Sequence, residues 1–216
     1  SANVDAGFSI VKYTGNGNTA QQSYGHGLSS APELLITKNM DTATQGTNSW
    51  VVGGTLLGNG GYMFLNRSNA KATASSYNGN KVPDSEVIYT SGTSDLVGNQ
   101  NGINFITYAF HSVDGYSKID SYVGNGSTTG PIVYVGFEPA WIMIKRSSSN
   151  ASGGNWIIKD NKRDTTNPNT QNLYANLSAA EENAYPVDFN SNNFQILESN
   201  VDINENGGTY IFMAIA

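Results

Sequence analysis

The chain has 216 residues, a formal net charge of -6 at pH 7 and only 13% charged residues, so neutral side chains carry most of its polarity. The acidic balance opposes binding to phosphate backbones, and we expect no nucleic-acid partner. The absence of cysteine excludes disulfides, thiol catalysis and zinc sites with cysteine ligands. No long apolar run and no charged-then-apolar leader is present, so we expect neither membrane insertion nor a signal peptide.

Short segments rich in β-branched and aromatic residues recur along the chain, and Gly, Asn, Pro or Ser bounds each of them, as is typical of strands. The best helical candidate, 177–183, is only about two turns long, and Pro186 soon follows it. We therefore predict an all-β protein. The predicted strands are 8–13, 33–38, 50–52, 62–65, 86–90, 103–110, 116–123, 132–135, 141–145, 156–159, 173–177, 194–197 and 210–215.

The sequence also contains a long internal repeat. Gly7-Phe-Ser-Ile-Val-Lys-Tyr-Thr-Gly-Asn-Gly17 is matched by Gly115-Tyr-Ser-Lys-Ile-Asp-Ser-Tyr-Val-Gly-Asn-Gly126, and each Gly-Asn-Gly is a predicted tight turn. The repeat aligns Tyr13 with Tyr122, Lys38 with Lys145, and Trp50 with Trp156.

From the repeat we expect two sandwich-like domains of the jelly-roll or concanavalin type, residues 1–110 and 111–216, related by a pseudo-twofold axis. The link 111–115 is too short for a flexible linker, so we expect the halves to pack directly on one another. The most apolar strand of each half lacks clean alternation, as strands buried on both faces do. Four residues of these strands are therefore expected in the core: Leu35, Ile36, Ile142 and Ile144.

Little in the sequence points to catalysis. The only histidines are His26 and His111, too few for a multi-histidine metal site. Laminarinase-type glycosidases carry Glu-x-Asp-x-x-Glu on one strand; the nearest match, 200–205, begins with Asn200, so the nucleophile is missing. The pair Glu181-Glu182 is interpreted as solvated charge. We expect no enzyme, with a cryptic glycan hydrolase as an alternative.

The same segment places side-chain oxygens at Asp202, Asn204 and Asn206, an alternation that resembles the start of a calcium loop. The twelfth position is Met213 rather than Glu, which excludes an EF-hand. A looser calcium site remains an alternative to a plain turn, and we expect no other cofactor.

Tyrosines beside amides and hydroxyls are typical of sugar recognition, because the rings stack on pyranose faces while the amides bind hydroxyls. Shared turns serve the fold, so we place any ligand site in segments where the two halves differ. The predicted ligand-binding residues are Tyr24, Tyr77, Asn78, Asn80, Tyr174 and Tyr185, and we expect the four tyrosines to be exposed.

Several motifs carry a resemblance over essentially the whole chain: the paired Tyr-x-Gly-Asn-Gly turns, Gly-His-Gly-Leu28, Gly-Phe-Glu-Pro139 and Gly-Gly-Thr-Tyr-Ile-Phe-Met-Ala214. With them the chain resembles a domain of unassigned function in virion structural proteins, tail fibres or related appendages, of marine tailed bacteriophages. That domain often accompanies concanavalin-like lectin modules. The long segment 66–85 departs from the shared pattern.

The resemblance implies a non-enzymatic module made in the host cytoplasm and exposed on the virion surface. Its implied partners are a host-surface glycan and neighbouring virion subunits, with a homo-oligomer as one arrangement. The alternative is a purely structural decoration, spacer or oligomerisation domain. The resemblance implies no catalytic residues.

Overall fold

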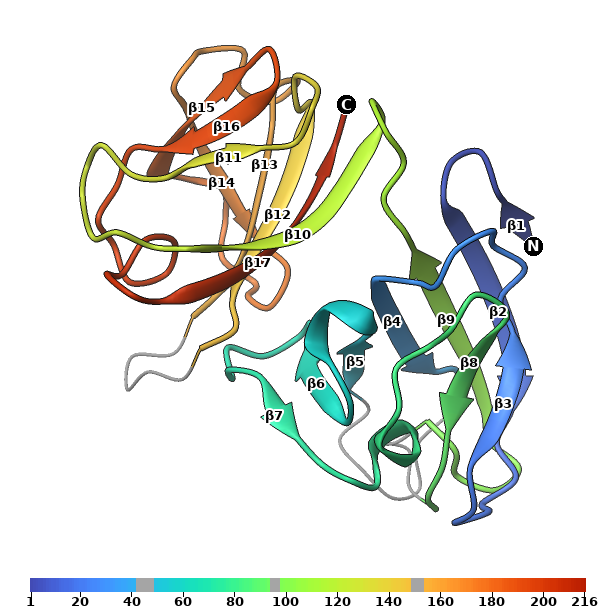
Figure 1. Ribbon diagram of the computed structural model, residues 1–216. Helices are drawn as coiled ribbons and strands as arrows, with labels where there is room; N and C mark the ends of the chain where they lie inside the picture. The colour runs from blue at the N-terminus through green and yellow to red at the C-terminus, as the bar shows by residue number, and fades with distance from the viewer. Residues whose placement is uncertain (42–48, 94–97, 149–153) are drawn as a thin grey trace. The chain divides into compact units, whose positions relative to one another are not determined.

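The computed structural model describes residues 1–41, 49–93, 98–148 and 154–216. Within these ranges it is all-β, as predicted, and the only helical elements are two short 3-10 turns, η1 (Thr55–Leu57) and η2 (Tyr77–Asn80) (Figure 1). No helix in the described ranges is long and apolar enough to cross a membrane.

The contacts divide the chain into two compact units. Unit 1 comprises Ser1–Leu65 and Lys71–His111, and unit 2 comprises Asn66–Ala70 and Ser112–Ala216. The expected boundary between 110 and 111 lies one residue before this division, but the expectation did not include the assignment of Asn66–Ala70 to unit 2. Direct packing of the two halves on one another stays a prediction.

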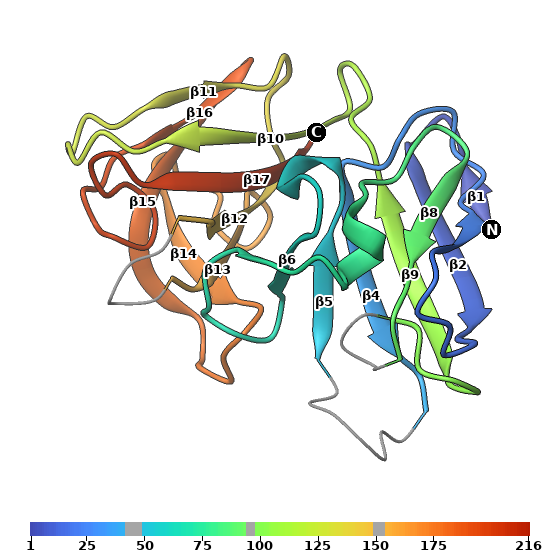
Figure 2. The same cartoon turned by 60° about the horizontal axis from the view of Figure 1, so that its bottom comes forward.

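Unit 1 contains a seven-stranded sheet in the order β1-β2-β9-β4-β5-β6-β7 and a separate pair, β3-β8. Figure 2 shows β2, β9 and β4 side by side, in agreement with their antiparallel pairing. A small core joins side chains of β4 and β9 to Ile88 of β8. The strands are β1 (Ala2–Asn3), β2 (Phe8–Thr14), β3 (Gln22–Gly25), β4 (Leu34–Asn39), β5 (Trp50–Gly53), β6 (Gly61–Phe64), β7 (Ala72–Thr73), β8 (Val87–Thr90) and β9 (Asn104–Phe110).

Unit 2 contains one eight-stranded sheet in the order β10-β17-β12-β13-β14-β15-β16-β11. Its core draws side chains both from β10, β17, β12 and β13 and from β15, β16 and β11. The sheet must therefore bend around β14, so that its two ends enclose the core. The strands are β10 (Ser117–Val123), β11 (Ile132–Tyr134), β12 (Trp141–Arg146), β13 (Trp156–Asp160), β14 (Asn169–Tyr174), β15 (Glu182–Asn190), β16 (Asn193–Ile196) and β17 (Thr209–Ile215).

The two units share a strand order. In unit 1 the sheet runs β2-β9-β4-β5-β6, and in unit 2 the corresponding run is β10-β17-β12-β13-β14. The register agrees as well: Lys38 lies opposite Trp50, and Lys145 lies opposite Trp156. The residues that the repeat aligns thus occupy matching positions in the two sheets.

A buried asparagine holds the Gly-Asn-Gly turn of unit 2. The Asn204 side chain is fully buried, and its Nδ2 donates to Asn125 Oδ1, Ser127 O and Glu198 O at 3.0, 2.8 and 2.7 Å. Its Oδ1 accepts the backbone N–H of Asn125 at 2.8 Å. One side chain therefore fastens the turn after β10 to the loop that precedes β17.

Asn99 makes the same contacts in unit 1. Its Nδ2 donates to Asn16 Oδ1, Asn18 O and Gly92 O, each at 3.1 Å, and its Oδ1 accepts the backbone N–H of Asn16 at 3.2 Å. We call this arrangement, centred on Asn99 or Asn204, the asparagine clamp. It explains why both halves carry an asparagine between the two glycines of the turn.

The first glycine of each turn is required by close backbone approach. A Cβ atom on Gly15 would lie 2.3 Å from Gln100 O, and one on Gly124 would lie 2.3 Å from Glu205 O. Neither approach can be relieved by a side-chain movement, because both obstructing atoms belong to the backbone. The turn glycines therefore serve the fold, as the sequence indicated.

The predicted core residues are confirmed with one exception. Leu35, Ile142 and Ile144 are at most 1% exposed. Ile36 is only partly buried, and its assignment to the core is wrong. Successive side chains of a strand point to opposite faces, so Ile36 lies on the face of β4 opposite to that of Leu35.

The strand predictions missed four elements: β3, β15 and the two-residue strands β1 and β7. β15 begins in the stretch considered for a helix; residues 177–183 contain no helix. β15 continues through Pro186, whose carbonyl accepts a hydrogen bond from Leu197 N. The strand predicted at 173–177 lies earlier in the chain, as β14.

Truncation of Ile144 to Ala is expected to lower the free energy of unfolding by about 2 to 5 kcal/mol, because it leaves a cavity in the unit 2 core. The matched variant Ile36→Ala removes the same atoms from a partly exposed side chain, and its cost should be clearly smaller. Urea denaturation of both variants measures the difference. Equal costs would contradict the burial difference between these positions.

The substitution Asn204→Asp keeps the shape of the clamp but removes its three donated hydrogen bonds and buries a charge among oxygen acceptors. We expect a loss of about 3 kcal/mol of unfolding free energy or more, measured by denaturant titration at pH 7. The control Asn206→Asp, two residues later and exposed, should change stability little. A tolerated Asn204→Asp would show that the clamp does not stabilise the turn.

Candidate functional site

The six predicted ligand-binding residues fall in two separate places. Tyr24, Tyr77 and Asn78 line one pocket of unit 1, and Asn80 ends the turn that carries two of them. The other two residues belong to unit 2. Tyr174 is the last residue of β14, and Tyr185 lies within β15. The two places are considered in turn.

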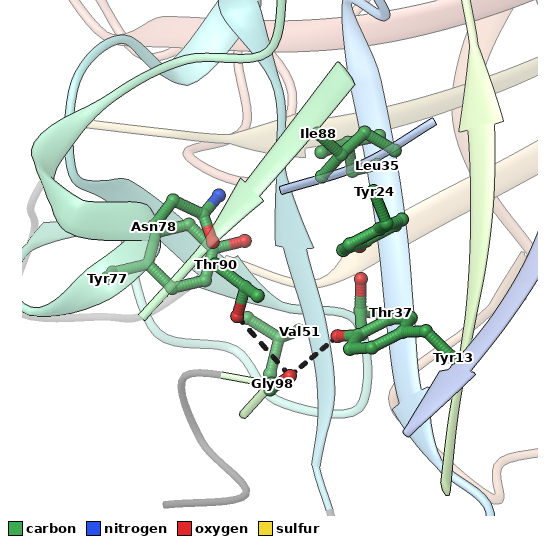
Figure 3. Close-up of a pocket in the computed structure, with 10 residues that line it drawn as sticks. All are labelled: Tyr13, Tyr24, Leu35, Thr37, Val51, Tyr77, Asn78, Ile88, Thr90 and Gly98. Carbon is green, nitrogen blue, oxygen red and sulfur yellow. Dashed lines mark hydrogen bonds between the residues drawn. The ribbon is translucent and has the colours of Figure 1, made fainter. Parts of the chain in front are cut away.

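The unit 1 pocket is lined by hydroxyl groups and apolar side chains (Figure 3). The rings of Tyr13 and Tyr24 stack with centroids 4.1 Å apart. Tyr13 Oη donates to Gly98 O at 2.7 Å, and Tyr24 Oη lies 3.0 Å from Thr107 Oγ1. The free volume is about 10 Å³, which is room for about one water molecule. This pocket cannot admit a sugar ring.

Tyr77 and Asn78 are buried, each 6% exposed, so the expectation that Tyr77 is exposed is wrong, and the Asn78 amide is not on the surface either. The turn that carries them has positive φ values of 50° at Asn78, 62° at Gly79 and 60° at Asn80. This left-handed turn directs Tyr77 toward Gly53, where an added Cβ would lie 2.3 Å from Tyr77 Oη. Asn80 itself is exposed.

Tyr24 is partly exposed but packs against the small core of unit 1. Burial raises the pKa of Tyr24 to about 12, and a hydrogen bond to Thr107 offsets part of that rise. Its hydroxyl therefore stays protonated and serves the buried network. In unit 1 the predicted ligand residues mainly complete the packing.

In unit 2 the structure brings the other two predicted tyrosines together with carboxylates and an amide. Tyr174 donates a short hydrogen bond to Glu182 Oε1. Tyr185 Oη donates to Asp202 Oδ2 at 3.1 Å, and Asn155 Nδ2 donates to the same oxygen at 3.3 Å. Both rings are partly exposed while packing against the unit 2 core. We call these five residues the tyrosine cluster.

The hydroxyl protons of the tyrosine cluster are firmly held. Burial raises the pKa of Tyr174, and its hydrogen bonds to Glu182 and Tyr185 raise it further. Burial also raises the pKa of Tyr185, with a further contribution from the charge of Asp202. Both hydroxyls are therefore donors across the neutral pH range, and the carboxylates keep free acceptor capacity for other donors.

Asn155 is itself held in place by a second amide. Asn176 Nδ2 donates to Asn155 Oδ1 at 2.8 Å, while Asn176 Oδ1 accepts the backbone N–H of Trp156 at 2.9 Å. The chain from backbone to Asn176, Asn155 and Asp202 fixes the carboxylate that Tyr185 contacts. A site whose side chains are fixed in advance loses less entropy when it binds.

The backbone at Tyr185 is also unusual. Its φ is 52°, in the left-handed region that residues other than glycine, asparagine and aspartate seldom occupy. Such a conformation costs about 1 to 3 kcal/mol and is found preferentially at functional sites. The surrounding contacts of Tyr185 must stabilise it.

The sequence indicated Tyr174 and Tyr185 but missed two members of the cluster. Glu182 was interpreted as solvated charge. It is exposed, yet its carboxylate accepts a hydrogen bond from the Tyr174 hydroxyl. Asn155 gave no signal. Asp202 was singled out as a calcium ligand, whereas in the structure its carboxylate accepts from Tyr185 and Asn155.

The three proposed calcium ligands have different environments. Asn204 is the fully buried centre of the clamp, Asp202 belongs to the tyrosine cluster, and Asn206 is exposed. In the described ranges, no group of three or more His, Asp or Glu side chains is placed to hold a metal ion. The calcium site stays a sequence prediction without a supporting contact.

The glycosidase-like segment 200–205 does not form a strand. Asn200 Oδ1 accepts the backbone N–H of Asp202 at 2.9 Å, and Asn200 O accepts from Ile203 N and Asn204 N. This is a turn, so the alternation that would place two carboxylates on one face of a strand is missing.

Two buried lysines lie near the cluster. Lys145 Nζ donates to Ser68 O at 3.0 Å and to Arg146 O at 2.9 Å, and burial lowers its pKa to about 8 although the charge of Asp202 opposes the shift. Lys159 Nζ donates to Ala184 O at 2.9 Å and to Gln171 O at 3.3 Å, and burial lowers its pKa to about 8 as well.

The fold and site together define an all-β protein with a partly exposed cluster of tyrosines and carboxylates. The chain belongs to the family described as a domain of unknown function, DUF7483, whose model matches residues 1–216. Comparison with curated proteins and with solved structures gave no match.

The buried lysines predict an alkaline stability maximum. Their pKa is lower in the folded state than in the unfolded chain, about 10.4, so loss of their protons favours folding and stability should rise with pH from about 8. Each lysine can contribute at most about 1.4 kcal/mol per pH unit. Above pH 10 the buried tyrosines, whose pKa values are raised, reverse the trend.

Urea denaturation at pH 7.5, 8.5 and 9.5 tests this, with Lys159→Met as the variant that should flatten part of the rise. A wild-type stability that falls steadily from pH 7.5 to 9.5 would contradict the lowered pKa values of the two lysines.

Proposed function

We propose that this chain is a non-enzymatic carbohydrate-binding module and that the tyrosine cluster of unit 2 is its binding site. The observation that carries the proposal is the arrangement of Tyr174 and Tyr185: both rings are partly exposed, and both hydroxyls are fixed by carboxylates. Fixed aromatic rings beside carboxylates that keep acceptor capacity provide stacking surface and hydrogen bonds for a sugar.

The setting of this activity follows from the resemblance to virion proteins. We place the module on the virion surface of a tailed bacteriophage, in a tail fibre or related appendage, where its ligand is a glycan of the host surface. The affinity of one such site is weak, and many copies on a particle compensate through multivalency. The matching registers and asparagine clamps of the two units favour an origin by duplication of one jelly-roll or concanavalin-like domain.

A second function, contact with neighbouring virion subunits or with a second copy of the chain, is favoured by the edges of the unit 2 sheet. Val123 of the edge strand β10 is 59% exposed, and Ile132 and Tyr134 of the edge strand β11 are 48% and 67% exposed. Apolar side chains on unpaired edges are typical of surfaces that associate. In this alternative the module decorates or connects virion parts and binds no glycan.

Replacement of Tyr174 and Tyr185 by Ala is expected to abolish retention of the protein on host-surface polysaccharide, because both stacking rings are lost. Retention on immobilised polysaccharide measures this, with folding checked by the melting transition since both rings also contact the core. The control Tyr116→Ala removes a tyrosine that is 43% exposed and lies outside the cluster. Unchanged retention in a folded double variant would reject the cluster as the site. Failure of the wild type to bind any host glycan would favour the structural alternative.

A further inference from the structure

We infer that the glycan bound at the tyrosine cluster carries a protonated amine, as a free amino sugar does. This inference rests on the proposed function and names the ligand class for the same site. It follows from the balance of charge around Tyr174 and Tyr185, from a buried amide on the same strand face, and from the chemistry that recognises ammonium groups.

The cluster contains two carboxylates, and the cations around it are buried or paired. Glu182 is exposed and Asp202 lies beside Tyr185, and neither forms an ion pair within the described parts of the chain. The nearby lysines Lys145 and Lys159 are fully buried, and each amine donates to two backbone carbonyls, so neither can reach a ligand, although the charge of Lys145 acts on Asp202.

The nearby arginines are occupied as well. Arg146 is paired with Glu205, and Arg163 is paired with Asp160 and Glu181. A uronate, sulfate or phosphate group would therefore meet the exposed Glu182 carboxylate, while these lysines are buried and these arginines are paired. The net charge of -6 adds to this repulsion.

Asn172 is an independent indication that the site is built for a polar ligand. It is fully buried, and neither atom of its side-chain amide has a hydrogen-bond partner in the parts of the chain that the structure describes. Asn172 lies directly opposite Glu182 in the β14–β15 ladder and two residues before Tyr174, so the three side chains share one face. Buried amides are normally paired, and an unsatisfied one is a place where water or a ligand group binds.

An ammonium group suits this set of contacts. It has three donors for carboxylate oxygens, and charge-assisted bonds of this kind are stronger than neutral ones. Its charge is also attracted to the faces of tyrosine rings. Replacing the amine by an acetamide keeps the sugar ring for stacking but removes the charge, so the two forms of one sugar separate stacking from charge recognition.

The test compares oligomers of glucosamine, N-acetylglucosamine and galacturonic acid for binding to the wild-type protein at low and high salt, by calorimetry. Glucosamine oligomers should bind at least tenfold more tightly than the acetylated form, with an affinity that falls as salt rises. Glu182→Gln, which keeps the acceptor but removes the charge, should bring the two affinities to within about threefold. The control Glu86→Gln changes an exposed carboxylate of unit 1 and should leave the preference intact.

The outcomes separate this inference from the proposed function. Equal affinity for the two glucosamine forms, or preference for the galacturonate, would overturn the inference while leaving a carbohydrate-binding cluster in place, provided that Tyr174→Ala weakens binding. Binding that Tyr174→Ala and Tyr185→Ala leave unchanged would overturn both. Loss of the amine preference in Glu182→Gln, with the melting temperature preserved, is the result that we expect.

Discussion

The asparagine clamp is the interaction on which the rest of both units depends. A side-chain amide can donate and accept at once, so one buried Asn satisfies four backbone and side-chain groups that come from two distant segments. The same loop contains Ile203, whose carbonyl accepts a hydrogen bond from the hydroxyl of Tyr122 on the edge strand β10. In unit 2 this loop also carries Asp202. The clamp therefore sets the position from which the carboxylate meets Tyr185.

The two units share a strand order but differ in the side chains of their cores. In unit 1 the cross-strand pair Thr37 and Thr107 forms a hydroxyl contact of 2.9 Å that continues to Tyr24. At the corresponding register in unit 2 stand Ile144 and Phe212, both in the apolar core. With this apolar centre, Tyr174 and Tyr185 lie at the periphery of the core, and there they form the cluster with Glu182, Asp202 and Asn155.

The sequence was sufficient for the all-β class, most strands and the turn glycines, because strand propensity and tight turns are local properties. It was insufficient where contacts between residues distant in the sequence determine which side chains are buried or lie together. Tyr77 lies between polar residues and suggested exposure, yet a left-handed turn folds it beneath Gly53. β15 was not predicted because it begins with polar residues and contains Pro186. Glu182 joins the cluster through the pairing of β14 with β15, and Asn155 joins it through a chain of amide hydrogen bonds. Neither contact can be predicted from the spacing of residues in the sequence.

The assignment of Asn66–Ala70 to unit 2 has a consequence for how the family can evolve. The chain leaves unit 1 after Leu65, contributes Ser68 O as an acceptor for the buried Lys145 amine, and returns to unit 1 at Lys71. No single cut in the chain therefore yields two complete units: a fragment beginning at Ser112 lacks the carbonyl that solvates Lys145. An exchange of the second half would therefore have to include Asn66–Ala70 to keep this acceptor.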